Sequence, residues 1–160
     1  MSIFEIETNS EHETKEIAET LASLIKPGTV ITLEGDLGAG KTTFTKGLAK
    51  GLEIKRAVTS PTFTILKQYE GTLTLNHIDA YRLEDSEEDI GLDDYIYGDG
   101  VTVIEWAKFI DDFLPTERLA LTIEFIDTRK RKLTFQPIGD SYKHIVEQLK
   151  EIVAKRGSKK

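Results

Sequence analysis

The sequence GDLGAGKT occupies residues 35–42 and decides how this chain folds. It matches the phosphate-loop pattern G-x-x-x-x-G-K-[ST] at every fixed position. Residues 29–33 before it are mostly β-branched and apolar, which predicts a short buried strand. Phe44, Leu48 and Leu52 after it form one apolar stripe of a helix. Because a strand precedes the loop and a helix follows it, a phosphate-binding loop explains the motif better than a glycine-rich turn with an exposed lysine.

The residue types in this loop suit a nucleoside phosphate. Glycines let the backbone curl so that successive N–H groups point at the phosphates, and the N-terminus of the helix adds partial positive charge. Lys41 is expected to reach the β- and γ-phosphates and to act in catalysis, and Thr42 to offer its hydroxyl to Mg²⁺. The nucleotide-binding residues predicted from the motif are Gly35, Asp36, Leu37, Gly38, Ala39, Gly40, Lys41 and Thr42.

A phosphate loop also needs a carboxylate near the magnesium, normally at the end of a neighbouring buried strand. Residues 101–104 are apolar and β-branched and run into Glu105, so we expect Glu105 to lie beside the metal. Residues 75–78 form a more mixed strand that ends in Asp79. On that strand Asp79 would share a face with His77, so its carboxylate is expected to be partly buried unless it faces a cleft. For both acids, a surface position at a strand end is the alternative.

Four further features have both a functional and a purely structural interpretation. Thr62 follows the loop helix, where nucleoside triphosphatases often keep a hydroxyl that senses the γ-phosphate, although Ser-Pro-Thr is also a common turn. Trp106 follows Glu105 directly and would serve equally well in core packing. Arg129 could contact phosphate or stack on a base, or lie on the surface. Residues 84–94 hold seven acids and no base, which indicates a solvated face or a docking surface.

The composition is that of one soluble globular domain of 160 residues. The chain has no cysteine, which excludes disulfides and thiolate metal sites, and its three histidines lack the paired spacing of a histidine site. No stretch approaches the ~18 apolar residues of a membrane-spanning helix, so we expect a cytoplasmic protein without membrane contacts. The net charge of −7 is opposite to the basic footprint of a protein that grips nucleic acid directly.

The remaining elements predict a layered α/β domain. Ser10 and Glu13 form a capping box that begins a helix, and a last helix is expected after Asp140. Residues 63–69 and 73–78 read as one hairpin, and residues 119–126 and 131–137 as another. We therefore expect a three-layer α/β fold of the phosphate-loop NTPase kind, with a mixed sheet that is parallel at its centre and flanked by hairpins.

The domain organisation that follows is simple. Residues 1–155 are expected to form a single domain, and residues 156–160 a basic tail that frays. An acidic helix is expected over residues 84–94, and a short helix between Ala107 and Pro115.

Four motifs occur in a fixed order along the chain. They are GDLGAGKT at residues 35–42, TSPTFT at 59–64, HIDAYRL at 77–83 and IEW at 104–106. In this combination the chain resembles the bacterial TsaE family, also called YjeE. The resemblance implies a small ATPase that is needed for the threonylcarbamoyl modification of adenosine beside the tRNA anticodon, and that works with TsaD and TsaB. The tRNA would then be reached only indirectly, through that complex.

The resemblance also implies roles for particular residues. The nucleotide residues fall on Gly35 to Thr43, the switch threonine on Thr62, the acid of the H-x-D motif on Asp79 and the magnesium-side acid on Glu105. Residues 8–10 and Arg129 are expected to flank the adenine. We also expect Trp106, because it adjoins Glu105, to lie at the bound nucleotide. Lys41, Asp79 and Thr62 are thus the predicted catalytic residues, with ATP and Mg²⁺ as the cofactors.

Three other functions share the phosphate loop. A small-molecule kinase would normally carry an arginine-bearing lid, and no arginine cluster follows the loop in this sequence. A GTPase would carry an N/T-K-x-D element, and neither Thr14-Lys15-Glu16-Ile17 nor Thr45-Lys46-Gly47-Leu48 ends in aspartate. A nucleotide-gated binding protein, in which ATP orders a surface for a partner, stays open alongside the ATPase.

Overall fold

The computed structural model describes residues 3–35, 40–55, 58, 66–80, 96, 98–107 and 114–157. In chain order, its helices and strands are β1 (Phe4–Thr8), α1 (Glu11–Ala22), β2 (Val30–Glu34), α2 (Lys41–Gly51), β3 (Leu66–Tyr69), β4 (Leu75–Asp79), β5 (Val101–Glu105), β6 (Arg118–Phe125), β7 (Arg131–Ile138) and α4 (Asp140–Gly157). The acidic helix predicted over residues 84–94, and most of the short helix predicted before Pro115, lie outside the described residues.

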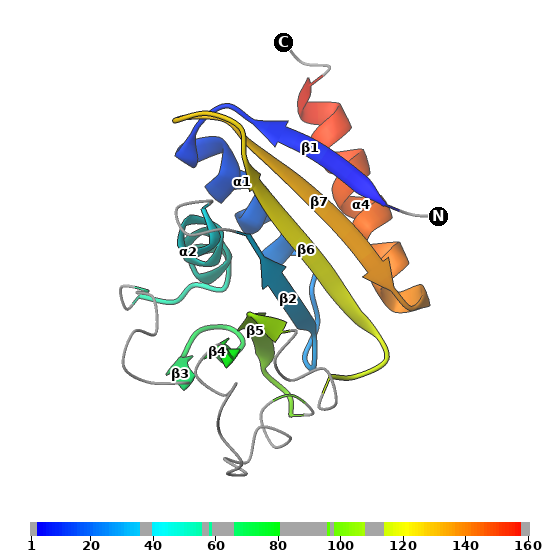
Figure 1. Cartoon of the computed structure of the whole chain (residues 1–160). Coiled ribbons are helices and arrows are strands. Elements are labelled where there is room, and N and C mark those ends of the chain that lie inside the picture. The colour runs from blue at the N-terminus through cyan, green and yellow to red at the C-terminus, as the bar shows by residue number, and fades with distance from the viewer. Residues whose placement is uncertain are drawn as a thin grey trace.

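Within the described residues, the strands form one sheet of seven in the order β1-β7-β6-β2-β5-β4-β3. β2 pairs in parallel with both β5 and β6, and β5 pairs in parallel with β4. The β3/β4 and β6/β7 hairpins pair antiparallel at the two sides of this parallel centre (Figure 1). The predicted α/β class, with a mixed sheet, a parallel centre and flanking hairpins, is confirmed.

One edge strand was not expected from the sequence. β1 pairs antiparallel with β7, so that Phe4 lies opposite Phe135 and their rings stack with centroids 5.9 Å apart. Its apolar residues Phe4 and Ile6 alternate with Glu5 and Glu7, which is the period of a strand with one buried face. The sequence did not predict this strand, because two alternating apolar residues are too few to distinguish a strand from a loop.

The first helix begins where its capping box predicted. The Ser10 hydroxyl accepts a hydrogen bond from the Glu13 backbone N–H at 3.1 Å, and the Glu13 carboxylate accepts one from the Asn9 N–H at 2.9 Å. The helix ends at Ala22, and the helix-breaking sequence Lys-Pro-Gly follows at residues 26–28. The last helix begins at Asp140, as predicted, and its backbone continues through Gly157 into the segment expected to fray.

Apolar side chains are buried on both faces of the sheet. Helices α1, α2 and α4 lie on one face (Figure 1) and share a core with residues such as Ile31, Leu121 and Phe135. On the other face a smaller cluster of buried residues consists of Val30, Ile78, Ala80, Ile96, Ile104 and Ala107. No helix within the described ranges is both long and apolar enough to cross a membrane.

Helices α1 and α2 pack at unusually short distance because glycines face the contact. A Cβ at Gly47 would lie 2.6 Å from the Lys15 carbonyl oxygen and 2.9 Å from the Ala18 Cβ. A Cβ at Gly51 would lie 2.5 Å from the Ala22 Cβ. This contact fixes the position of α2, the helix that begins at the phosphate loop.

We expect Gly47→Ala to lower the free energy of unfolding by about 1–3 kcal/mol, because the added methyl group meets backbone atoms of α1. In an ordinary helix the same substitution would raise stability by ~1 kcal/mol, because alanine favours the helix more than glycine does, so the expected effect has the opposite sign. Urea denaturation measures it. Lys46→Ala is the control on the same helix, since Lys46 is exposed, and it should change stability by less than about 0.5 kcal/mol. A stabilised Gly47→Ala protein would contradict the close packing.

Candidate functional site

The central parallel strands end at the same edge of the sheet, and the candidate site lies there. Glu105, the last residue of β5, is in register with Leu33 of β2 on one side and with Asp79 of β4 on the other. Equivalent positions on neighbouring strands point to the same face, which for Glu105 and Asp79 is the face covered by α2. The parallel register therefore brings the two acids predicted from sequence side by side at the start of α2.

The turn into α2 presents the first residues of this helix toward the same edge. Gly40 precedes the helix with φ of 110°, a left-handed conformation that glycine adopts at little cost. No side chain among the described residues caps this helix end, which is unusual because its first N–H groups need partners. Backbone N–H groups and the positive end of the helix dipole thus converge there, an arrangement that favours an anion.

Lys41 is the first residue of α2, and it is buried rather than extended into solvent. Its side chain is 7% exposed, and its Nζ lies 3.6 Å from Glu105 Oε1. The Nζ also lies 4.5 Å from the centre of the Trp106 ring, a cation–π contact. Trp106 itself has φ of 60°, which is strained for an aromatic residue. Backbone strain of this kind concentrates at functional sites, because the surrounding structure must hold it.

Glu105 also contacts a histidine that the sequence analysis had not assigned a role. The Nε2 of His77, on β4, lies 2.5 Å from Glu105 Oε2. Burial alone would raise the pKa of Glu105, but the hydrogen bond and charge of His77, together with Lys41, outweigh it and hold this pKa below its ordinary value of 4.5. Glu105 is therefore a carboxylate, and His77 donates the hydrogen bond.

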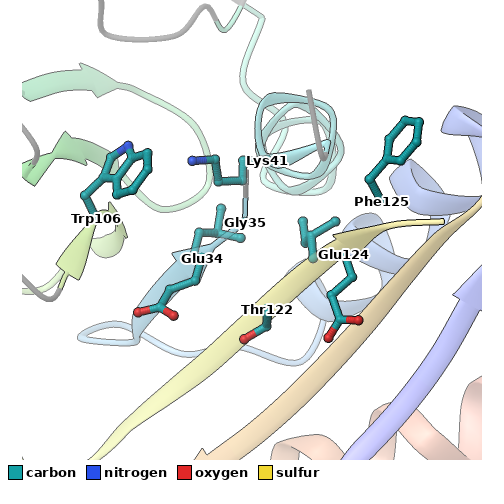
Figure 2. Close-up of a pocket in the computed structure, with 9 residues that line it drawn as sticks. Glu34, Gly35, Lys41, Trp106, Thr122, Glu124 and Phe125 are labelled. Carbon is teal, nitrogen blue, oxygen red and sulfur yellow. The ribbon is translucent and has the colours of Figure 1, made fainter. Parts of the chain in front are cut away.

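A pocket of about 480 Å³ opens beside this network. Figure 2 shows Lys41 directed toward Trp106, with Phe125 on the opposite side of the start of α2. The residues that line the pocket are Leu33, Glu34, Gly35, Lys41, Trp106, Thr122, Ile123, Glu124 and Phe125. Gly35, Lys41 and Trp106 were predicted at the site. The residues from β6 were not, because only the parallel pairing of β6 with β2 brings the end of β6 to this edge.

The other predicted residues fall into three groups. Thr42 and Thr43 are half-buried in the first turn of α2. Arg129 is exposed in the β6/β7 turn, where its backbone N–H donates to Asp127 Oδ1 at 2.8 Å, and it is not among the residues that line the pocket. The predicted site residues Asp36, Leu37, Gly38, Ala39 and Thr62 lie outside the described residues.

Arg131, two residues after Arg129, was not predicted at the site and lies closer to the phosphate loop. Its guanidinium stacks over the Phe125 ring at 4.6 Å, and a Cβ at Gly40 would lie 3.7 Å from its Nε. A basic run at residues 129–132 was the available signal, but the sequence does not show which of its members turns toward the loop.

Comparison with known proteins gives the family of this chain. The family model described as "Threonylcarbamoyl adenosine biosynthesis protein TsaE" matches residues 8–133. The chain belongs to the TsaE family. The match includes residues 35–42, both strand-end acids and all of β6, and it ends within β7, so it covers all the residues that line the pocket.

Individual members of the TsaE family match most of the chain. A Bacillus subtilis protein named tRNA threonylcarbamoyladenosine biosynthesis protein TsaE is 53% identical over 143 residues, which cover 89% of this chain and 90% of that protein. The Aquifex aeolicus protein of the same name is 42% identical over 132 residues, which cover 81% of this chain and 92% of that protein. The crystal structure of Bacillus subtilis YdiB has a TM-score of 0.81 at 45% identity and covers 93% of this chain and 95% of that one.

The lowered pKa of Glu105 makes a prediction about stability. A carboxyl group whose pKa is lower in the folded protein than in the unfolded protein stabilises the fold. This stabilisation is complete above the pKa of the unfolded state, and it disappears as the pH falls through the pKa of the folded state. We therefore expect Glu105→Gln to cost the most stability near neutral pH, and the cost to shrink below pH 4.5. Urea denaturation of both proteins across this pH range measures the difference.

Glu147→Gln is the matched control, because Glu147 is an exposed acid on α4 outside this network. A difference between parent and Glu105→Gln that grows as the pH falls would contradict the predicted direction.

Proposed function

We propose that this chain binds Mg-ATP at the phosphate loop and hydrolyses it slowly, in support of the threonylcarbamoyl modification of tRNA adenosine (t6A). The observation that carries the proposal is the contact between Lys41, at the start of α2, and Glu105, at the end of a parallel strand, beside an open pocket. A cation and a carboxylate at these two positions are what a phosphate loop and its metal-side acid require.

Each residue has a distinct role in this proposal. Lys41 exchanges its contact with Glu105 for the β- and γ-phosphate oxygens and neutralises their charge. Backbone N–H groups of residues 35–43 hold the phosphates, and Trp106 borders the phosphate end of the nucleotide. Asp79, in register with Glu105, is the candidate to orient the attacking water, with Thr62 as the residue that senses the γ-phosphate.

The residues present fit a magnesium ion that the nucleotide helps to hold. No cluster of three or more acids, histidines or cysteines occurs within the described part of the chain that would hold a metal by itself. The Thr42 hydroxyl and one Glu105 oxygen are hard oxygen donors, and Mg²⁺ commonly takes only one or two protein ligands and completes its shell with phosphate and water. Bound Mg²⁺ would neutralise charge that develops on the phosphates.

The biological role rests on the family. Relatives that match most of the chain are named for tRNA threonylcarbamoyladenosine biosynthesis. We propose TsaD and TsaB as the partners, with tRNA reached only through their complex, in keeping with the net charge of −7. A partner also suits the chemistry, because the contacts of Lys41 and Glu105 within the described residues include no arginine.

We expect Lys41→Ala to abolish ATP hydrolysis, because it removes the positive charge that the phosphates need. We expect Thr42→Ala to weaken the dependence of ATP hydrolysis on Mg²⁺. Phosphate release at saturating ATP measures both. Lys50→Ala, which removes an exposed lysine from the same helix, should hydrolyse ATP at the parent rate. Circular dichroism checks the fold, since Lys41→Ala leaves the buried Glu105 carboxylate without its lysine. Hydrolysis at the parent rate by Lys41→Ala would end the phosphate-loop assignment.

We expect the isolated chain to hydrolyse ATP slowly and a TsaD–TsaB complex to accelerate it. In phosphate-loop enzymes, an arginine supplied by a partner accelerates hydrolysis ~10³–10⁵-fold. A partner that completes the site can therefore raise the rate strongly. Multiple-turnover assays with and without the complex measure the acceleration. Full-speed hydrolysis by the lone chain would refute partner dependence. ATP-dependent partner binding without acceleration would favour the nucleotide-gated binding protein instead.

A further inference from the structure

His77 is a buried polar residue that the proposed mechanism does not use. It lies on β4, two residues before Asp79, and is 0% exposed. Within the described residues, the only hydrogen bond of its imidazole runs from Nε2 to Glu105 Oε2. Its other ring nitrogen, Nδ1, is buried and has no hydrogen-bond partner among those residues.

This pattern is costly for a residue that serves only to fill space. A buried polar atom without a partner destabilises a fold by about 1–3 kcal/mol, and an apolar side chain of similar size would avoid that cost. Its neighbours on this face include Leu75 of β4 and Val103 of β5, which are both apolar and fully buried. The contact with Glu105 is therefore what the imidazole provides at this position.

The two oxygens of Glu105 have different partners. Oε2 accepts the hydrogen bond from His77, and Oε1 faces the Lys41 ammonium at 3.6 Å. A carboxylate held through one oxygen cannot rotate freely, so its other oxygen keeps one direction. Here that direction is toward the start of α2, where Thr42 follows Lys41.

We propose that His77 is a positioning residue for Glu105. By holding Oε2 it presents Oε1 toward the divalent cation that accompanies the nucleotide, and so it sets the affinity for Mg²⁺ without touching the nucleotide. This inference rests on the proposed function, in which Glu105 is the metal-side acid. Partners of this kind, which orient a ligand from behind, typically contribute about 10–100-fold to metal affinity.

Two amide variants of the full-length chain test this role. The His77→Gln side chain is long enough to donate to Glu105 in place of Nε2, whereas that of His77→Asn is one methylene shorter and does not reach. We expect His77→Asn to weaken Mg²⁺ binding at least tenfold, and His77→Gln to retain most of the parent affinity. Calorimetric titration of ADP at a series of Mg²⁺ concentrations measures this without relying on hydrolysis. Titration in EDTA should give similar ADP affinities for parent and variants.

The control variant on the same strand is Asn76→Ala. Asn76 is buried on the opposite face of β4 and accepts a hydrogen bond from Gln68 at 2.9 Å, so its loss perturbs the strand and not the site. It should leave the Mg²⁺ dependence unchanged. Equal losses in His77→Asn and His77→Gln, or no loss in either, would overturn the positioning role.

A double-variant cycle gives a second, independent measurement. If His77 acts through Glu105, then adding His77→Asn to a Glu105→Ala protein should not weaken Mg²⁺-dependent ADP binding any further. An additional loss of the full size would show that His77 acts by another route and overturn the inference. A parent protein that binds no ADP, or binds it without regard to Mg²⁺, would instead refute the proposed function.

Discussion

The parallel pairing of β5 with β2 and β4 is the constraint on which the candidate site depends. Parallel strands end at the same edge of the sheet, so this pairing sets Glu105, Asp79 and the start of the phosphate loop beside one another. Lys41 reaches the same edge from α2, whose position is fixed by the glycine contacts with α1. A shift of β5 by one residue would turn Glu105 to the opposite face and separate it from both Lys41 and His77.

The network at this edge shows how charged groups are kept in a mostly apolar core. Removing an ion pair from water costs several kcal/mol per ion, which only good geometry and further hydrogen bonds offset. Lys41 and Glu105 receive that support from Trp106 and His77 respectively. The burial also has a functional advantage, because electrostatic interactions with a phosphate or a metal are stronger in a site from which water is largely excluded.

The pocket is asymmetric, and the asymmetry follows from the sheet order. On the β5 side of the loop lie the carboxylate of Glu105 and the ring of Trp106. On the β6 side lies Phe125 (Figure 2). The guanidinium of Arg131 stacks over its ring. Under the proposed function, the first side would face the metal and the terminal phosphates, and the second would offer flat surfaces to a base or sugar. Because β2 lies between β5 and β6, its end at Glu34 and Gly35 lies between the two surfaces.

The sequence alone determined the elements whose signals are local. The strand and the helix on either side of residues 36–39, the capping box at Ser10 and both hairpins could be predicted, because each depends on residues close together in the chain. Glu105 was predicted by its place at the end of an apolar strand. Only the tertiary structure decided the order and register of the strands. It shows that β6 borders β2, that His77 contacts Glu105, and that β1 lies at the edge of the sheet. These contacts join residues far apart in sequence, and no local pattern of hydrophobicity or turn residues specifies which strands become neighbours.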